Sequence, residues 1–340
     1  GDHLGLTAPE IGVPEGAALT VTKESDGSVT AAGGANAAGI GGGYGESGGA
    51  VTVNGGTVKA FSASGAGIGG GDNGSGGTVT VSGGNVTATS LMKAGIDGTF
   101  STGENGNAVI AASSISDQSG KASTSTTPWS GLIIEGTTGA LYGTSVTPTA
   151  DFTVPKGDTV TLGNSDTAAQ TLTVASGITM TNNGTINIKK GDTLVIDGAL
   201  VNNGTITIED GGTLVNNGVI TNNSGAVITN NGDVSGSGAV TDNGTITPKT
   251  LPDLTAPTVT LCTSDTVTLK DELPAYTSFR YAKGDASSAA YSEWQKSPSF
   301  TGLTADTVYT FYAKYDVAGL PFYSYAEAGS GTAVRTRLSQ

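Results

Sequence analysis

One segment of this chain, Gly39-Ile40-Gly41-Gly42-Gly43 followed by Gly48-Gly49-Ala50-Val51-Thr52-Val53, occurs in two copies. The second copy, Gly67-Ile68-Gly69-Gly70-Gly71 followed by Gly76-Gly77-Thr78-Val79-Thr80-Val81, lies 28 residues further on, and Ile96 marks a degenerate third copy. A fixed period of this size is typical of proteins that stack one structural unit on the next. The repeat therefore predicts a solenoid.

Apolar residues alternate within each copy, which predicts strands rather than helices. The alternating positions are Val51, Val53, Val58 and Ala60, then Val79, Val81, Val86 and Ala88. Strands of about four residues bounded by Gly-Gly pairs are too short for stable hairpins, so we expect each to pair in parallel with its equivalents in neighbouring coils. The expected fold class is all-β, a right-handed parallel β-helix with small aliphatic side chains inside.

A second repeat follows, in which Asn-Asn-Gly recurs at residues 182–184, 202–204, 216–218 and 230–232, and Asp242-Asn243-Gly244 closes the series. An Asn-Gly pair between two strands is also the signature of a two-residue hairpin, and that alternative stays open. We favour further coils, because asparagine suits a corner and stacked asparagines can form amide ladders.

Composition divides the chain near residue 250, since 50 of the 55 glycines and only six of the aromatic residues precede residue 251. We expect a β-helix over residues 1–250, a proline-rich linker over 251–257 and a small antiparallel β-sandwich over 258–340. The Ser/Thr-rich residues 113–128 predict an exposed loop that leaves the coil.

Within the C-terminal part, Leu303-Thr304-Ala305-Asp306-Thr307-Val308-Tyr309 resembles the corner of a fibronectin type III domain, in which a leucine precedes the corner tyrosine by six residues. The resemblance implies a sandwich that acts as a spacer. We expect Trp294, Tyr309 and Phe311 to pack in its core, with a ligand-stacking platform as the alternative.

Charge and composition exclude several classes of function. The net charge is −14 and the basic residues do not cluster, which argues against nucleic-acid binding. A single cysteine, Cys262, excludes an internal disulfide, and no apolar run approaches the roughly 18 residues of a membrane span. The chain begins at Gly1 without a signal peptide, which we interpret as trimming, and we expect a monomer.

β-Helices also host polysaccharide lyases and glycoside hydrolases, so an enzyme is the second hypothesis. Pectate-lyase-like enzymes resemble one another in a catalytic arginine, and no arginine precedes Arg280; polygalacturonase-like enzymes pair aspartates with a histidine, and the only histidine is His3. Stacking can still bring together the two carboxylates that a glycosidase needs, from Asp72, Asp97, Glu104 and Asp117. We nevertheless expect no catalytic residues.

Two sets of residues are candidates for binding. Gly69-Gly70-Gly71-Asp72-Asn73-Gly74 partly matches calcium-binding nonapeptides, but Ser75 stands where those need an apolar residue. We expect no cofactor, with calcium as the alternative and Asp72, Asn73 and Asp97 as its ligands. For a polysaccharide or host glycan, the aromatic residues that can stack on sugar rings are Tyr44, Phe61, Trp129 and Tyr142.

The Ala-Gly-Ile-Gly-Gly-Gly phrases at residues 38–43 and 66–71, the Gly-Gly-x-Val-Thr-Val strands and the Trp129-Ser130-Gly131 restart resemble repeat-rich, adhesin-like cell-surface proteins of Gram-positive gut bacteria. The resemblance implies a secreted or cell-surface fragment without catalytic activity. We therefore expect an adhesin or carbohydrate-binding stalk with a sandwich spacer. A polysaccharide-cleaving enzyme and a passive stalk are the alternatives.

Overall fold

The computed structural model describes residues 8–25, 27–121, 129–163, 169–271, 276–284, 291–317, 321–325 and 331–338, without the side chains of residues 104–106. The chain divides into two compact units, Gly1–Thr247 and Pro248–Gln340. Apart from one short 3-10 turn, the regular structure within these ranges consists of strands, so the all-β prediction is confirmed. No helix in the described ranges has the length and apolarity needed to cross a membrane.

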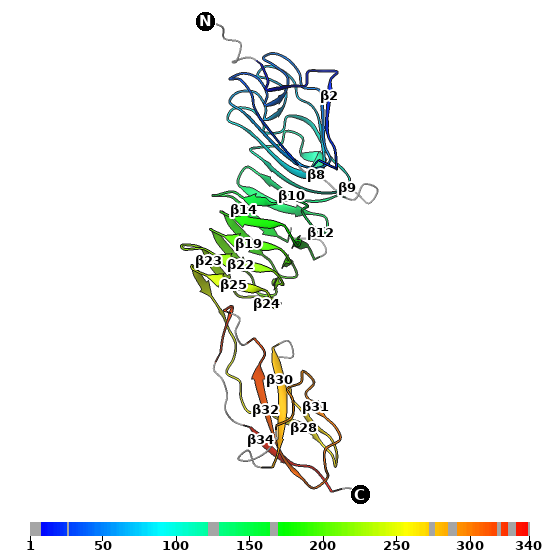
Figure 1. Cartoon of the computed structure of the whole chain (residues 1–340), viewed down its shortest axis with the longest axis vertical. Helices are drawn as coiled ribbons and strands as arrows, with labels where there is room; N and C mark the ends of the chain where they lie inside the picture. The colour runs from blue at the N-terminus through cyan, green and yellow to red at the C-terminus, as the bar shows by residue number, and fades with distance from the viewer. Residues whose placement is uncertain are drawn as a thin grey trace. The chain divides into compact units, whose positions relative to one another are not determined.

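The first unit opens with parallel strands from successive 28-residue copies, as the repeat predicted (Figure 1). Val51 pairs with Val79, and Ile40 pairs with Ile68. A bridge from Ile68 to Ile96 confirms the third copy. The strands are β1 (Ile11–Gly12), β2 (Ala18–Val21), β3 (Ser28–Ala32), β4 (Ile40–Gly41), β5 (Ala50–Val53), β6 (Thr57–Ser62), β7 (Ile68–Gly69), β8 (Gly77–Ser90) and β9 (Gly98–Ala112).

Glycine is required where neighbouring coils approach most closely. Gly41 has a φ of 141°, and a Cβ atom at this residue would lie 1.9 Å from the carbonyl oxygen of Gly69 in the next coil. The alternating valines of the same coils point inward and are buried, Val51 and Val53 at 1% and 0% exposure. Small side chains inside and glycines at the corners together allow the strands to stack in register.

Residues 113–121 do not leave the coil, contrary to our prediction of an exposed loop over 113–128. Ile115 is buried and bridges to Ile96, which adds one more level to the isoleucine column. The chain then forms a 3-10 turn, η1 (Gln118–Lys121). The remaining residues of the predicted loop, 122–128, lie outside the described ranges.

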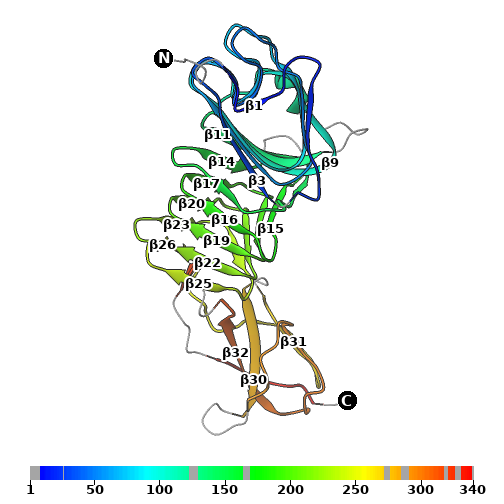
Figure 2. The same ribbon diagram turned by 45° about the horizontal axis from the view of Figure 1, so that its top comes forward.

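After a hairpin of β10 (Ser130–Glu135) and β11 (Thr138–Tyr142), the chain visits three parallel sheets in turn (Figure 2). The largest sheet, which β11 joins, continues with β14 (Thr159–Leu162), β17 (Thr185–Ile188), β20 (Thr205–Ile208), β23 (Val227–Asn230) and β26 (Thr245–Thr247). The second contains β12 (Ser145–Val146), β15 (Thr171–Val174), β18 (Thr193–Ile196), β21 (Thr213–Asn216) and β24 (Asp233–Ser235). The third contains β13 (Phe152–Val154), β16 (Thr179–Asn182), β19 (Ala199–Asn202), β22 (Val219–Asn222) and β25 (Ala239–Asp242).

The hairpin interpretation of Asn-Asn-Gly is wrong. β16 and β17 flank the first Asn-Asn-Gly, yet β16 pairs in parallel with β19, and β17 with β20. The predicted amide ladder is confirmed: Asn182, Asn202, Asn222 and Asp242 lie one above the other at intervals of 20 residues, joined by side-chain hydrogen bonds of 2.8 Å. The Asn-Asn-Gly copies at 216–218 and 230–232 begin on the other two sheets, at the ends of β21 and β23.

The second unit contains two antiparallel three-stranded sheets and a short parallel pair. Side chains from both three-stranded sheets, among them Leu269, Phe279 and Phe311, form one buried cluster. Tyr309 is buried, and its hydroxyl accepts a 2.9 Å hydrogen bond from the backbone N–H of Thr304, as in a tyrosine corner. The strands are β27 (Lys249–Thr250), β28 (Val259–Cys262), β29 (Val267–Leu269), β30 (Thr277–Lys283), β31 (Ser299–Phe300), β32 (Val308–Tyr315), β33 (Tyr323–Ser324) and β34 (Thr332–Arg335).

Residues 251–257, which we predicted as a linker, pack against the second unit. Leu251 is 3% exposed, and its backbone N–H donates to the carbonyl oxygen of Ser324. The Tyr315 hydroxyl donates a 2.7 Å hydrogen bond to the carbonyl oxygen of Pro252. The proline-rich composition is typical of a connector. In the structure, however, the side chain of Leu251 is buried, and backbone groups of Leu251 and Pro252 form hydrogen bonds with residues of the second unit.

Candidate functional site

Two of the predicted residues meet on the glycine-rich turns of the first unit. Tyr44 is 53% exposed, and its hydroxyl accepts a 3.4 Å hydrogen bond from the side-chain amide of Asn73 in the next copy. Asn73 adopts a left-handed backbone conformation, with a φ of 61°, which asparagine tolerates better than most residues. The ring of Tyr44 therefore lies at the surface, and its hydroxyl is hydrogen-bonded to the turn of the next copy.

A lysine side chain, Lys93, reaches the backbone oxygens of these turns. The ammonium group of Lys93 lies 2.8 Å from a carboxylate oxygen of Asp97 and donates to the carbonyl oxygens of Gly71, at 3.0 Å, and Gly74, at 2.6 Å. Asp97, predicted as a calcium ligand, is thus the partner of a lysine. Within the described ranges, no three Asp, Glu, His or Cys side chains gather as a metal site would require.

The four aromatic candidates for sugar stacking are not brought together on one surface. Phe61 is 42% exposed, whereas Trp129 is 1% exposed and belongs to the core. Its ring packs 6.0 Å from that of Tyr142, which is half-buried. Burial, and secondarily the negative charge of Glu135, raises the pKa of Tyr142. Trp129 and Tyr142 therefore form an internal aromatic pair, and Trp129 offers no free face to a sugar.

Of the four acidic residues that we considered for catalysis, Asp97 and Asp117 are engaged with different partners. Asp117 accepts hydrogen bonds from the hydroxyl and backbone N–H of Ser119 and from the backbone N–H of Phe100. The Ser119 hydroxyl is the main cause of the lowered pKa of Asp117. Asp97 is paired with Lys93, and the side chain of Glu104 lies outside the described set.

An open polar cleft of about 780 Å³ lies at another corner of the coils. Its walls are the turns at residues 23–25, 54–57 and 82–84, which lie one above the other, together with Asn107 and residues 149–150. Asn85 donates to the carbonyl oxygen of Asp151, and Asn107 accepts from the backbone N–H of Thr147, so both hold the segment that forms the far wall. The charged residues of the lining are Lys23 and Glu24.

Paired glycines create this cleft. A Cβ atom on Gly55 would lie 2.8 Å from the carbonyl oxygen of Lys23, and one on Gly83 would lie 2.5 Å from that of Asn54. The corners can stack only without side chains, which leaves backbone and small polar groups lining the wall. The Gly-Gly repeat in the sequence signals these corners, but nothing in it indicates that residues 149–150 close the cleft from more than 60 positions away.

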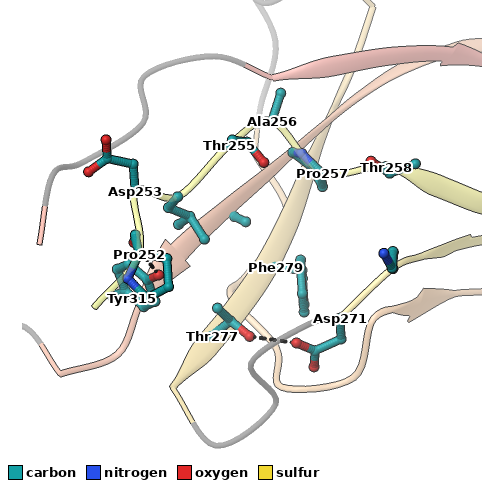
Figure 3. Close-up of a pocket in the computed structure, with 13 residues that line it drawn as sticks. Pro252, Asp253, Thr255, Ala256, Pro257, Thr258, Asp271, Thr277, Phe279 and Tyr315 are labelled. Carbon is teal, nitrogen blue, oxygen red and sulfur yellow. Dashed lines mark hydrogen bonds between the residues drawn. The ribbon is translucent and has the colours of Figure 1, made fainter. Parts of the chain in front are cut away.

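The second unit has a smaller pocket of about 210 Å³ beneath residues 252–258 (Figure 3). Phe279 and Tyr315 reach it from β30 and β32, and Asp271 accepts a 2.8 Å hydrogen bond from the hydroxyl of Thr277 at its edge. Burial, together with the charge of Asp253, raises the pKa of Tyr315. Its volume is about a quarter of that of the cleft in the first unit, about 210 against 780 Å³, so we give the larger cleft precedence.

Comparisons with protein-family models, with curated proteins and with solved structures found no match to this chain.

Proposed function

We propose that this chain is a non-catalytic, extracellular carbohydrate-binding stalk, and that the polar cleft of the first unit binds a segment of a polysaccharide or host glycan. The observation that supports this proposal is the lining of the cleft. Sites for drug-like ligands are lined mainly by apolar and aromatic side chains, whereas Ser, Thr, Asn and glycine make up most of this lining. Such groups both donate and accept hydrogen bonds, which matches the hydroxyls of a sugar chain.

The carboxylates of the lining favour binding over cleavage. Most glycosidases use two carboxyl groups, about 5 to 10 Å apart, and among the described residues of the lining Glu24 alone carries one. Lys23 beside it offsets its charge. A neutral or weakly charged glycan is therefore the ligand class that fits this cleft.

We further propose that the parallel stacks close into a right-handed β-helix and that the second unit is a fibronectin type III-like sandwich. In favour of closure, the chain visits the three sheets in a constant order, and the inward residues Ile186, Leu194 and Leu200 are each at most 1% exposed. In favour of the sandwich, Tyr309 forms the corner hydrogen bond to Thr304. An experimental structure with an open, one-sided stack would contradict the first of these proposals.

A glycan array with three forms of the full chain tests the binding proposal. Ser25→Trp places a large ring in the cleft, and Leu91→Trp, at a 76% exposed residue outside the lining, is the matched control. We expect the wild type and the control to bind the same glycans and Ser25→Trp to lose them. Equal binding by all three forms would place the ligand elsewhere, and binding by none would leave the passive stalk.

Cleavage is tested on the same preparations. The chain is incubated with pectin, mucin and similar polymers, and new reducing ends are measured over time. We expect no increase above a heat-inactivated control. An increase that Ser25→Trp abolishes would replace the binding proposal with a polysaccharide-cleaving enzyme in the same cleft.

A further inference from the structure

The outer face of β30 and β32 in the second unit carries a cluster that the proposed cleft does not use. Phe279 and Tyr281 point into the core, so the alternate residue Arg280 and its cross-strand partner Tyr312 lie on the opposite face. Residues 291–295 run along the other edge of β30, with bridges from Tyr291 to Ala282 and from Gln295 to Phe279. This places Tyr291 and Trp294 beside Arg280.

Arg280 is surrounded by rings rather than by carboxylates. Its guanidinium carbon lies 3.8 Å from the ring centroid of Tyr291, 4.5 Å from that of Trp294 and 5.9 Å from that of Tyr312. In the described part of the chain it has neither an ion pair nor a hydrogen bond, and its Nε atom is buried without a partner. By contrast, Arg335 on β34 pairs with Asp306 at 3.0 Å.

Other cations lie close by. The ammonium group of Lys314 is 4.7 Å from the ring of Trp294, and its side chain is 44% exposed. Asp316 is bound mainly by Lys296, at 2.7 Å, and by the hydroxyl of Ser278, while Lys314 lies 3.8 Å from it. Among the described residues, Lys296 and Lys314 thus share the carboxylate of Asp316, and Lys314 and Arg280 both lie over the ring of Trp294. Positive side chains therefore gather here on a chain whose net charge is −14.

Aromatic rings contact a guanidinium through its faces and leave its edges available. At Arg280 the Nε atom is buried, so the edge in question is the one formed by the two Nη groups. That edge is a planar fork that matches the two oxygens of a carboxylate or sulfate, and such paired, charge-assisted hydrogen bonds are among the strongest in proteins. Tyr291 is 45% exposed beside it and can contact the ring of a sugar. The arrangement thus combines an unused oxyanion receptor with an adjacent aromatic surface.

We propose that Arg280, Lys314 and Tyr291 form a second binding site, which takes a saccharide bearing a carboxylate or sulfate group. Two cations suit a single oxyanion. Nucleic acid carries a phosphate on every nucleotide and is bound by extended basic surfaces, which the negative charge of this chain opposes. The site lies in the other unit from the cleft and takes a different ligand class, so it does not depend on the proposed function.

Titration of the full chain at low ionic strength tests this site, with oligogalacturonate as the carboxylate probe, sulfated dextran fragments as the sulfate probe and uncharged dextran as the control. Calorimetry measures affinity, and the fluorescence of Trp294 reports on the site itself. We expect binding of at least one acidic probe, weakened about tenfold or more by Arg280→Gln, as for the loss of hydrogen bonds to a charged group. Arg280→Lys keeps the charge but loses the planar fork, so we also expect weaker binding.

Arg335→Gln is the matched control, because it removes an arginine of the same unit that is already paired with Asp306. Lys314→Gln and Tyr291→Ala alter exposed side chains, and they test the site if Arg280→Gln fails to fold. The proposal is overturned if neither acidic probe binds, if Arg335→Gln weakens binding as much as Arg280→Gln, or if inorganic phosphate or single-stranded DNA binds equally well. Ser25→Trp should leave this binding unchanged, which separates the outcome from that of the cleft.

Discussion

The side-chain amide of Asn202 donates a 2.8 Å hydrogen bond to the side-chain oxygen of Asn222, its equivalent one coil further along the stack. The side-chain oxygen of Asn202 in turn accepts a hydrogen bond from the side-chain amide of Asn182 in the preceding coil. Both Asn202 and Asn222 are fully buried. The amide ladder therefore satisfies, coil by coil, polar groups that would otherwise be unpaired inside the stack.

The ladder makes Asn202 a strong determinant of stability. Asn202→Ala removes the donor to the buried oxygen of Asn222 and the acceptor of the Gly204 backbone N–H, and it leaves the amide of Asn182 with the carbonyl oxygen of Thr205 alone. We therefore expect a loss of about 3 kcal/mol in the free energy of unfolding. Asn203→Ala is the control, because Asn203 belongs to a parallel but exposed ladder with Asn183 and Asn223. We expect it to change stability by about 0.5 kcal/mol or less in urea unfolding. Equal losses in both variants would contradict a special role for the buried ladder.

Two requirements for glycine at residue 41, the close contact between coils and the positive φ, can be measured separately. Both Gly41 and Gly45 have positive φ, of 141° and 73°, but a Cβ atom on Gly45 meets nothing within 4 Å. We expect Gly45→Ala to cost about 1 kcal/mol through backbone strain alone. Gly41→Ala, which would drive its methyl group into the backbone of Gly69, should cost several times as much. Thermal unfolding of the two variants, side by side, measures the difference.

Lys93 should make the glycine-rich turns insensitive to calcium. Because its ammonium group already binds Asp97 and two carbonyl oxygens, we expect the same melting temperature in a chelator and in millimolar calcium. Lys93→Met leaves the partly buried Asp97 without its cation and should cost about 2 kcal/mol. Adding Asp97→Asn should recover part of that loss. A calcium-dependent rise in the melting temperature of the wild type would show that a metal competes for these oxygens.

Acid should weaken the first unit through Glu135. Burial acts to raise the pKa of this carboxyl, but hydrogen bonds from Lys121, Ile115 N–H and Gln118 outweigh it, so the pKa lies below its ordinary value of 4.5. A carboxyl with a lowered pKa stabilises the fold above its unfolded pKa, and this contribution is lost as the pH falls through the folded pKa. We expect the melting temperature to fall below about pH 4.5, and to fall less in Glu135→Gln.

Glu15→Gln, at an exposed turn, is the matched control for this pH dependence. It should leave the acid-induced fall of the wild type unchanged. If Glu135→Gln showed the same fall as the wild type, another carboxyl would have to account for it.

Much of the first unit followed from local pattern. Alternation from Val51 to Ala60 predicted the strands, and the 28-residue repeat predicted their parallel stacking, which the pairing of Val51 with Val79 confirms. These features could be predicted because they depend on adjacent residues and on one repeat length of 28 residues. The Asn-Asn-Gly copies were harder, because those at 182–184 and 216–218 look alike in sequence yet lie on different sheets.

The candidate sites were much less predictable. Exposure of Tyr44 and burial of Trp129 depend on how distant segments of the first unit pack, which no local pattern encodes. The role of Lys93 was not predictable, because its three oxygen partners, at residues 71, 74 and 97, meet only in the folded chain. Arg280 likewise stood out only as the first arginine of the chain.

Short strands were predictable from the sequence alone, as were glycines at the corners and equivalent residues that recur in register. Strand alternation and corner conformation are properties of a few consecutive residues, which is why local pattern was sufficient. Three features followed only from the fold: which corner opens into a cleft, which oxygens Lys93 binds and which arginine is left among rings. Those outcomes depend on contacts between residues far apart in the chain. From the sequence, several residues could form the same contact, and only the packing shows which of them does.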